Sequence, residues 1–190
     1  MDVRRVVTGH DGQGKAVFVS DAPVVPVTLS LQPGAEFHTL WGADAPVAFP
    51  GDGSRPVAER YFPPLGGFRF GFFTIPPDDQ PGAPPDVDVV AGLAELRRKL
   101  PGLIDYVDPD EVGMHTTASV DFGVVLSGQA LLELDDGATV VLDVGDTYIQ
   151  NGTRHRWSNP GDVPAVLAVA LLGAEHADVD VPGPTEASDR

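Results

Sequence analysis

The sequence predicts an all-β protein, a double-sheet jelly-roll barrel with one peripheral helix. Of its 190 residues, 22 are glycine, 19 are proline and 42% are hydrophobic. The apolar residues fall mostly in short runs separated by turn-forming residues, and only one stretch has the period of an amphipathic helix. Many short strands joined by turns favour a sandwich or a barrel over a helical bundle. A chain of this length can bury the core of one such domain.

The N-terminal third predicts a hairpin, an edge strand and a loop. The valine-rich residues 3–8 and 15–20 flank a turn that contains glycine, which is the pattern of a β-hairpin. Residues 24–31 have the composition of a further strand, but Pro26 restricts that strand to an edge or a bulge. Residues 42–67 contain glycines and prolines without any period, so we expect an irregular loop there.

A strand, a linker and the helix are predicted next. In residues 67–75, phenylalanines alternate with small or basic residues, and we expect the face that they share to be buried. These phenylalanines are Phe68, Phe70 and Phe72. The proline-rich residues 78–87 predict a linker. Residues 88–100 predict the helix, because Asp88 is a suitable cap and leucines recur along one side. We expect this helix to pack on the outside of the barrel.

Seven short strands are predicted in the second half of the chain, where turn signals recur every few residues. They cover residues 113–117, 121–127, 130–134, 139–142, 147–150, 155–158 and 165–172. The chain is therefore expected to have four parts. An N-terminal β extension (1–77) packs on the barrel, a linker and helix (78–104) follow, residues 105–173 form the barrel core, and the acidic tail (174–190) is flexible.

Charge and composition exclude several classes of function. The formal net charge is −16, from 28 acidic and 12 basic side chains, so the surface repels nucleic acid and anionic lipid. The chain has no cysteine, which excludes disulfides, thiolate metal sites and a cysteine nucleophile. We find no apolar run long enough to span a membrane and no signal-peptide core at the N-terminus. We therefore expect a cytoplasmic protein without nucleic-acid or membrane partners.

Two histidines and one carboxylate are the candidate functional side chains. Alternate residues of a strand point to the same face, so His115 and Thr117 share a face. After a tight turn, the next strand can present Asp121 beside them. His155 and Trp157 share a face on a later strand. We expect strand pairing to bring the two imidazoles and the carboxylate together inside the mouth of the barrel.

These segments resemble the two signature motifs of the cupin superfamily, over roughly residues 105–173. In the first motif, His115 stands at the first histidine, Asp121 at the carboxylate and Gly128 at the closing glycine. Four residues stand at positions of the second motif, namely Gly145, Gly152, His155 and Asn159. The chain departs from the family pattern at Thr117, where a second histidine is usual, and at Gln150, where proline is usual.

The resemblance implies a cupin-type double-stranded β-helix and a divalent metal ion held by His115, Asp121 and His155. Fe, Mn, Ni, Co and Zn are all compatible with such ligands, and the threonine at position 117 leaves open that no metal is bound. The predicted catalytic residues are Asp121, His155 and Thr117, with Asp121 acting as a base where metal is absent. Similarity to small single-domain cupins also implies a role in secondary metabolism.

The predicted substrate pocket is lined by Trp157, Tyr148, Gln150 and Arg154. The two aromatic residues suit an apolar or aromatic ligand, and they equally suit the core. Arg154 would bind a substrate carboxylate through two hydrogen bonds, or else lie in solvent. We expect His38 and Trp41 to fold over the pocket or across a partner chain. No phosphate-binding loop or dinucleotide fingerprint is present, so a metal is the only cofactor indicated.

Three functions are compatible with this site. The leading hypothesis is a metal-assisted, non-redox conversion of a small oxygenated organic molecule by dehydration, isomerisation, cyclisation or decarboxylation. The first alternative is an Fe(II)-dependent dioxygenase, and the second is a non-catalytic module that binds a small molecule. We also expect a homodimer in which the N-terminal strands cover a neighbouring sheet edge.

Overall fold

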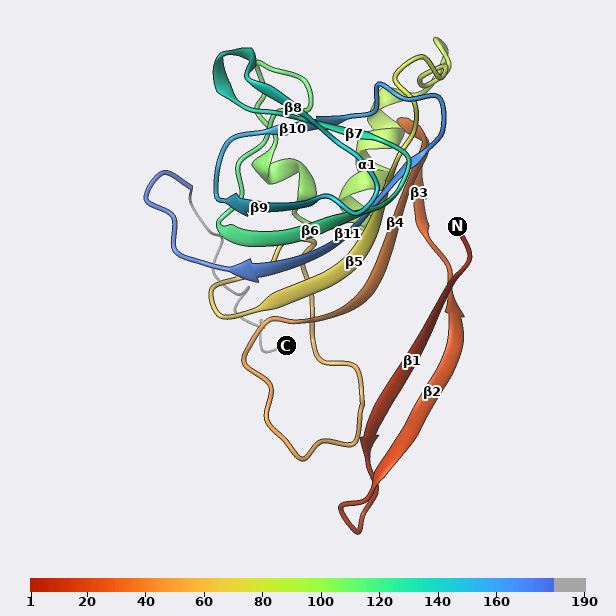
Figure 1. Ribbon diagram of the computed structural model, residues 1–190, viewed down its shortest axis with the longest axis vertical. Coiled ribbons are helices and arrows are strands. Elements are labelled where there is room, and N and C mark those ends of the chain that lie inside the picture. Colours follow the sequence, from red (N-terminus) through yellow and green to blue (C-terminus); the bar gives the residue numbers. More distant parts are fainter. Residues whose placement is uncertain (180–190) are drawn as a thin grey trace.

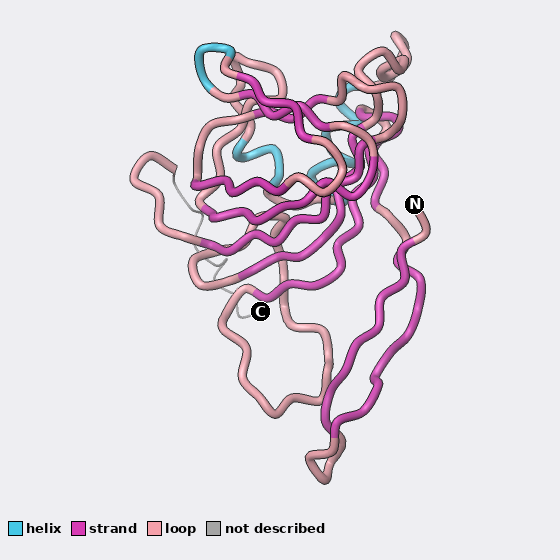
Figure 2. Tube along the Cα trace, viewed as in Figure 1, coloured by secondary structure: helices cyan, strands magenta, loops and turns pink. Residues whose placement is uncertain are grey.

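Strands make up most of the regular backbone of the computed structural model, which describes residues 1–179 (Figures 1 and 2). The strands are β1 (Val3–His10), β2 (Ala16–Val24), β3 (Val27–Leu29), β4 (Gln32–Ala43), β5 (Phe68–Ile75), β6 (Ser119–Ser127), β7 (Ala130–Glu133), β8 (Thr139–Leu142), β9 (Thr147–Asn151), β10 (Arg156–Ser158) and β11 (Ala165–Gly173). The helices are α1 (Val89–Lys99) and the short 3-10 turns η1 (Leu103–Tyr106) and η2 (Asp135–Gly137). The prediction of an all-β fold with one helix is confirmed.

Two antiparallel sheets face each other and form a cupin-type jelly-roll barrel (Figure 1). The large sheet has the order β3-β4-β5-β11-β6-β9, and the small sheet has the order β10-β7-β8. Isolated bridges from Val107 to His115 and from His115 to His155 continue the pairing beside β10. The main core fills the space between the sheets, with buried side chains from both. This core contains Ile75, Val125, Ala130, Leu142, Tyr148, Ala165 and Leu167.

The predicted helix is present, and it closes one end of the barrel. Asp88 caps α1 by accepting a hydrogen bond from the Ala91 N–H at 3.0 Å, and Pro101 follows its end. The buried Leu96 and Leu100 join Leu29, Ala35 and Phe37 in a second core cluster at the β3–β4 end of the large sheet. The helix therefore covers a barrel opening, where Figure 1 shows it between the two sheets.

The N-terminal segment forms part of the barrel itself, which differs from the predicted extension. Three of its strands, β3, β4 and β5, make one half of the large sheet. Strand β4 was not predicted, because Pro33, Gly34 and Gly42 interrupt its pattern and both Phe37 and His38 are buried on opposite faces. The expected boundary between residues 1–77 and the barrel core at 105–173 therefore cuts through one sheet.

The buried face of β5 is opposite to the predicted one. Phe73 and Ile75 point into the barrel, where they contact the core clusters. Adjacent residues alternate, so the phenylalanines expected to be buried lie on the outer face, and Phe70 is 41% exposed. They are Phe68, Phe70 and Phe72. On β5, the face that carries these aromatic residues is the outer one. The alternation in the sequence shows that the strand has two different faces, but it does not tell which face meets the core.

The β1–β2 hairpin projects from the barrel and meets the long loop that follows β4 (Figure 1). His10 N–H donates to the Gly51 carbonyl at 2.8 Å, which ties the hairpin to this loop. The hairpin carries exposed apolar side chains, of which Phe18 is 80% exposed. The predicted homodimer stays a prediction.

Two smaller expectations concern the segment before β6 and the tail. The strand predicted at 113–117 is reduced to the single bridged residue His115, because the chain around it turns at Gly113. Residues 180–190 of the predicted flexible tail lie outside the described residues. The described part of the tail includes His176, whose Nε2 lies 3.0 Å from the Gly152 carbonyl. Within residues 1–179, no helix combines the length and the apolar character needed to cross a membrane.

Candidate functional site

His115 and His155 lie side by side inside the barrel. The backbone N–H of each residue donates to the carbonyl of the other at 2.9 Å. Their ring centroids are 4.1 Å apart with an interplanar angle of 51°. Two segments that are distant in the sequence therefore place two imidazoles in one site.

Hydrogen bonds to the backbone fix the tautomer of both rings. His115 Nδ1 lies 3.1 Å from the Gly113 carbonyl, and His155 Nδ1 lies 2.8 Å from the Thr153 carbonyl. A carbonyl only accepts, so each Nδ1 carries a proton and each Nε2 keeps its lone pair. Burial lowers the pKa of His115, and burial together with the neighbouring His115 lowers the pKa of His155 to about 4. Both rings are therefore neutral near pH 7, the form that binds a metal.

Asp121 is a buried carboxyl group whose charge changes near neutral pH. Its side chain is 6% exposed, and Ser119 Oγ donates a hydrogen bond to Oδ1 at 2.6 Å. Ser119 Oγ also lies 3.0 Å from Thr117 Oγ1, so alternate residues form a line of polar groups along one face. Burial raises the pKa of Asp121 to about 6, although the hydrogen bond from Ser119 opposes this shift.

Gln150 supplies an unsatisfied donor next to Asp121. The two residues are directly opposite each other in the β6–β9 pairing, so their side chains share the inner face. Gln150 Oε1 accepts from Thr153 Oγ1 at 2.8 Å, whereas the buried Nε2 has no partner among residues 1–179. A buried amide N–H without a partner costs free energy, and a ligand oxygen would satisfy it.

Tyr148 and Trp157 fill the interior beside this polar group. Their ring centroids are 4.7 Å apart, and both contact the main core cluster. Gly123, opposite Tyr148 in the β6–β9 pairing, makes room for the phenol, because a Cβ at this position would lie 2.4 Å from the Tyr148 hydroxyl oxygen. Of the predicted pocket residues, Tyr148 and Trp157 are therefore core residues that also border the site.

Three further residues belong to the site and were not predicted. Ser119 was assigned to a turn, although the alternation of Thr117, Ser119 and Asp121 would have placed it beside the carboxylate. Phe62 stacks on His115 at 6.4 Å, and Tyr61 contacts Phe62 edge-on at 4.9 Å. Both lie in the irregular loop before β5, where the sequence carries no signal for their position.

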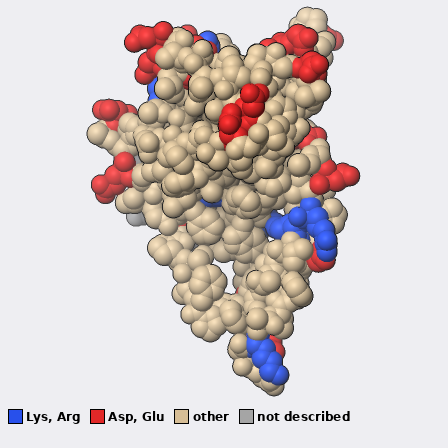
Figure 3. Space-filling view, in the orientation of Figure 1, with Lys and Arg blue, Asp and Glu red and all other residues tan. Residues whose placement is uncertain are grey.

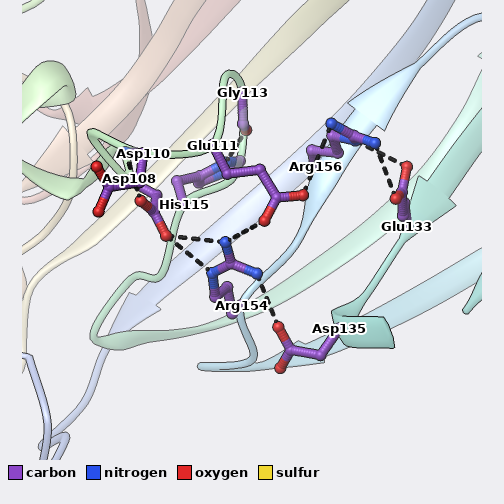
Figure 4. A network of polar contacts seen from close by, with 9 residues as sticks. All are labelled: Asp108, Asp110, Glu111, Gly113, His115, Glu133, Asp135, Arg154 and Arg156. Carbon is purple, nitrogen blue, oxygen red and sulfur yellow. Dashed lines mark hydrogen bonds and ion pairs between the residues drawn. The ribbon is translucent and has the colours of Figure 1, made fainter. Parts of the chain in front are cut away.

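Arg154 lies near His115, where its side chain is engaged in ion pairs. Its guanidinium is held by three carboxylates, at 2.8 Å from Asp108, 2.6 Å from Glu111 and 2.9 Å from Asp135 (Figure 4). These ion pairs join the segment before His115 to the small sheet. Arg154 therefore supports the loop that carries His115 and is not free to bind a substrate carboxylate.

The predicted ligands are residue types that bind divalent metals, but the structure does not gather all three of them into one site. The Nε2 lone pairs of His115 and His155 are suitable donors, and Asp121 is a suitable third. Over the described range, however, no three side chains of His, Cys, Asp or Glu are gathered closely enough to hold an ion. The three-ligand site remains a prediction, and the imidazole pair is the part of it that is in place.

His38 and Trp41 lie away from this site, on the outer face of the large sheet. His38 pairs with Phe72, and Trp41 pairs with Phe70. Arg5 of the hairpin lies 5.7 Å above the Trp41 ring. The expectation that these two residues fold over the pocket is therefore wrong, because they lie on the outer face of β4, and contact across a partner chain stays a prediction.

Proteins of known sequence resemble this chain over part or most of its length. The family model described as Cupin domain matches residues 106–171. The cupin-domain-containing oxidoreductase fogC of Aspergillus ruber is 34% identical over 174 residues, which are 90% of this chain and 72% of that protein. Phomopsin biosynthesis cluster protein C' of Diaporthe leptostromiformis is 27% identical over 156 residues, 82% of this chain and 69% of that protein. Oryzines biosynthesis cluster protein J of Aspergillus oryzae is 42% identical over 68 residues, only 36% of this chain and 38% of that protein.

Proposed function

Because this chain belongs to the cupin superfamily, we propose that it is an enzyme of secondary metabolism that performs a non-redox conversion of a small oxygenated organic molecule. The names of two relatives, which refer to biosynthesis clusters, support the metabolic role. The single observation that carries the proposed chemistry is the buried Asp121 carboxyl group with a pKa of about 6. Dehydration, isomerisation, cyclisation and decarboxylation all require a proton to move near an oxygen-bearing carbon.

Asp121 is the proposed proton carrier. A general base works best when its pKa lies near the working pH, and burial brings this carboxyl group into that range. The Ser119 hydroxyl, which donates to Oδ1, fixes one carboxyl oxygen and leaves the other to face the substrate. Thr117 holds the far side of Ser119 and is therefore a positioning residue.

Gln150 is the proposed donor to the substrate oxygen. Its unpartnered Nε2 lies on the same face as Asp121, and Thr153 holds the amide by donating to Oε1. An N–H directed at a carbonyl or enolate oxygen stabilises the negative charge that develops there when the proton leaves carbon. Base and donor are thus presented by adjacent strands.

We propose that a divalent metal ion, Fe, Mn, Ni, Co or Zn, binds at the Nε2 atoms of His115 and His155. Such an ion supplies Lewis-acid polarisation of a substrate oxygen when it is bound. The two Nδ1–H groups, which donate to backbone carbonyls, hold the rings in the tautomer that this requires. Metal analysis of the purified protein, before and after His155→Ala, tests this part separately.

The proposed reaction class is tested with a small-molecule extract of the producing organism and mass spectrometry. A non-redox conversion yields a product of unchanged mass, or one that has lost water or carbon dioxide. Asp121→Asn is expected to slow the conversion about 100- to 10,000-fold. Asp162→Asn, which makes the same chemical change in an exposed turn, is the matched control. Full activity of the Asp121 variant would contradict the assignment.

An Fe(II)-dependent oxygenation is the second candidate, because a relative is named an oxidoreductase. In that case the product gains oxygen atoms and the reaction consumes dissolved oxygen. Measuring oxygen uptake during the same incubation distinguishes the two candidates.

A further inference from the structure

A groove lies outside the barrel, between the hairpin and the large sheet. Strand β1 forms one wall, residues 47–56 of the long loop form the other, and the outer face of β4 and β5 forms the floor. We call this the hairpin groove. Its volume is about 860 Å³, within the range of small-molecule pockets. It is separate from the imidazole pair, which lies on the inner side of the sheet.

Apolar side chains line most of the hairpin groove. Trp41, Phe70 and Phe72 supply the floor, and Phe49 projects from the loop with 81% of its surface exposed. Figure 3 shows few acidic side chains on this lower part of the molecule, whereas acidic groups gather around the barrel above it. An apolar hollow with little negative charge is unusual on a chain with a net charge of −16.

One cation, Arg5, faces this apolar hollow. Its guanidinium lies over the Trp41 ring, and Nη1 donates to the Leu40 carbonyl at 3.0 Å. Its Nε is buried and has no hydrogen-bond partner, and no carboxylate in residues 1–179 pairs with Arg5. The neighbouring Arg4, on the other face of β1, is paired with Asp21 at 2.6 Å. Anchoring the hairpin therefore uses one N–H of Nη1, Nε is buried, and Nη2 makes no hydrogen bond within residues 1–179.

The far end of the hairpin groove is closed and carries an acid. Gly9 packs against the Asp52 backbone, where a Cβ would lie 2.4 Å from the carbonyl oxygen. The Asp52 carboxylate accepts from the Ser54 N–H at 2.8 Å. Since Gly9 is four residues along the strand from Arg5, the two ends are about 13 Å apart. The groove thus attracts an anion at the Arg5 end and repels one at the other.

We propose that the hairpin groove binds an organic monocarboxylate with an apolar body, such as a medium-chain fatty acid. The carboxylate pairs with the Arg5 guanidinium, which presents its N–H donors in a geometry that matches two carboxylate oxygens. The apolar body lies over Phe70 and Phe72, beyond the Trp41 ring that Arg5 covers. This site is independent of the proposed function of the barrel.

Calorimetric titration with octanoate and with octan-1-ol tests the charge requirement. The two probes share a chain length, so their difference reports the carboxylate. Octanoate is expected to bind about ten- to a hundredfold more tightly than octan-1-ol, and Arg5→Gln to remove this preference. Equal binding of both probes to the unaltered protein would overturn the proposal.

Arg4→Gln is the matched control, because it removes the same group from the solvent face of the same strand. It is expected to leave octanoate binding unchanged, and an equal loss in both arginine variants would contradict a specific site. Phe49→Glu provides a second test that does not depend on the hairpin anchor. A carboxylate at this exposed wall position is expected to weaken octanoate binding more than octan-1-ol binding, whereas an equal effect on both would count against the proposal.

A second copy of the chain is the competing occupant of the hairpin groove. Sedimentation of the protein with and without octanoate distinguishes the two. Binding of octanoate with an unchanged sedimentation coefficient supports the proposal. A dimer that excludes octanoate would show that the groove is an interface and would overturn it.

Discussion

Replacing Asp121 by asparagine is expected to stabilise the metal-free protein at neutral and alkaline pH. Asparagine has the same shape, and its Oδ1 can still accept from the Ser119 hydroxyl. It carries no charge, so the fold no longer has to bury a carboxylate. The group proposed to carry the proton is thus a source of instability in the folded chain.

The magnitude follows from the pKa of Asp121, which burial raises from 3.8 to about 6. The folded state binds this proton more tightly than the unfolded state does, so the free energy of unfolding falls as the pH rises from about 4 to about 6. The full loss is about 3 kcal/mol, of which about 1 kcal/mol has already been lost at pH 4.5. The variant is therefore expected to gain about 2 kcal/mol relative to the unaltered protein between pH 4.5 and pH 8.

Urea unfolding followed by tryptophan fluorescence, at pH 4.5 and pH 8, measures this change. A gain of about 2 kcal/mol corresponds to a shift of the urea midpoint on the order of 1 M. Because the cost of burying the new amide does not depend on pH, it cancels in the comparison between the two pH values. Asp162→Asn in its exposed turn is expected to show no such change. A stability difference between Asp121→Asn and the unaltered protein that is the same at both pH values would refute the reasoning.

Four further predictions concern the support of the site. Gly123→Ala should destabilise the fold by about 1–3 kcal/mol in thermal unfolding, because the added Cβ would overlap the Tyr148 ring. Gly12→Ala is the control and should be nearly neutral, because there is open space around Gly12. Asn159→Ala should cost about 2–4 kcal/mol in urea unfolding, because the fully buried amide bonds two carbonyls and an N–H. Arg154→Met should lower the urea midpoint slightly, and by less at high salt, because the three ion pairs are screened by solvent. His155→Ala should reduce the metal content found by elemental analysis; retention of all metal would place it elsewhere.

The strands after residue 119 could be predicted because turn-forming residues bracket each of them. At Gly128, for example, φ is +67° and a Cβ would lie 2.6 Å from the Pro164 carbonyl, so only glycine fits this turn. Strand β4 could not be predicted, because it is buried on both faces and has no alternating pattern. The outward position of Phe70 shows the same limit, since alternation reveals two faces without saying which one meets the core.

The candidate site was predictable where it depends on motif spacing and not where it depends on tertiary contacts. The spacing singled out both histidines and Asp121, but it could not reveal that no three such side chains are gathered closely enough to hold an ion in residues 1–179. Arginine is a residue type that often binds substrate carboxylates, which made Arg154 a candidate. Only the fold shows the three acidic side chains that surround it (Figure 4). Tyr61 and Phe62 reach the site from a loop whose path no local pattern determines.

The pairing of Gly123 with Tyr148 means that the space next to Asp121 is occupied by one ring and not by the main chain. Replacing Tyr148 by a smaller residue would enlarge the interior at a single position. The two imidazoles would keep the backbone pairing that holds them, and Asp121 would keep its hydrogen bond from Ser119. The size of molecule that the barrel admits can therefore change in evolution independently of the groups that move protons. A change at Tyr148 would adjust selectivity, while Asp121, Gln150 and the two histidines would preserve reactivity.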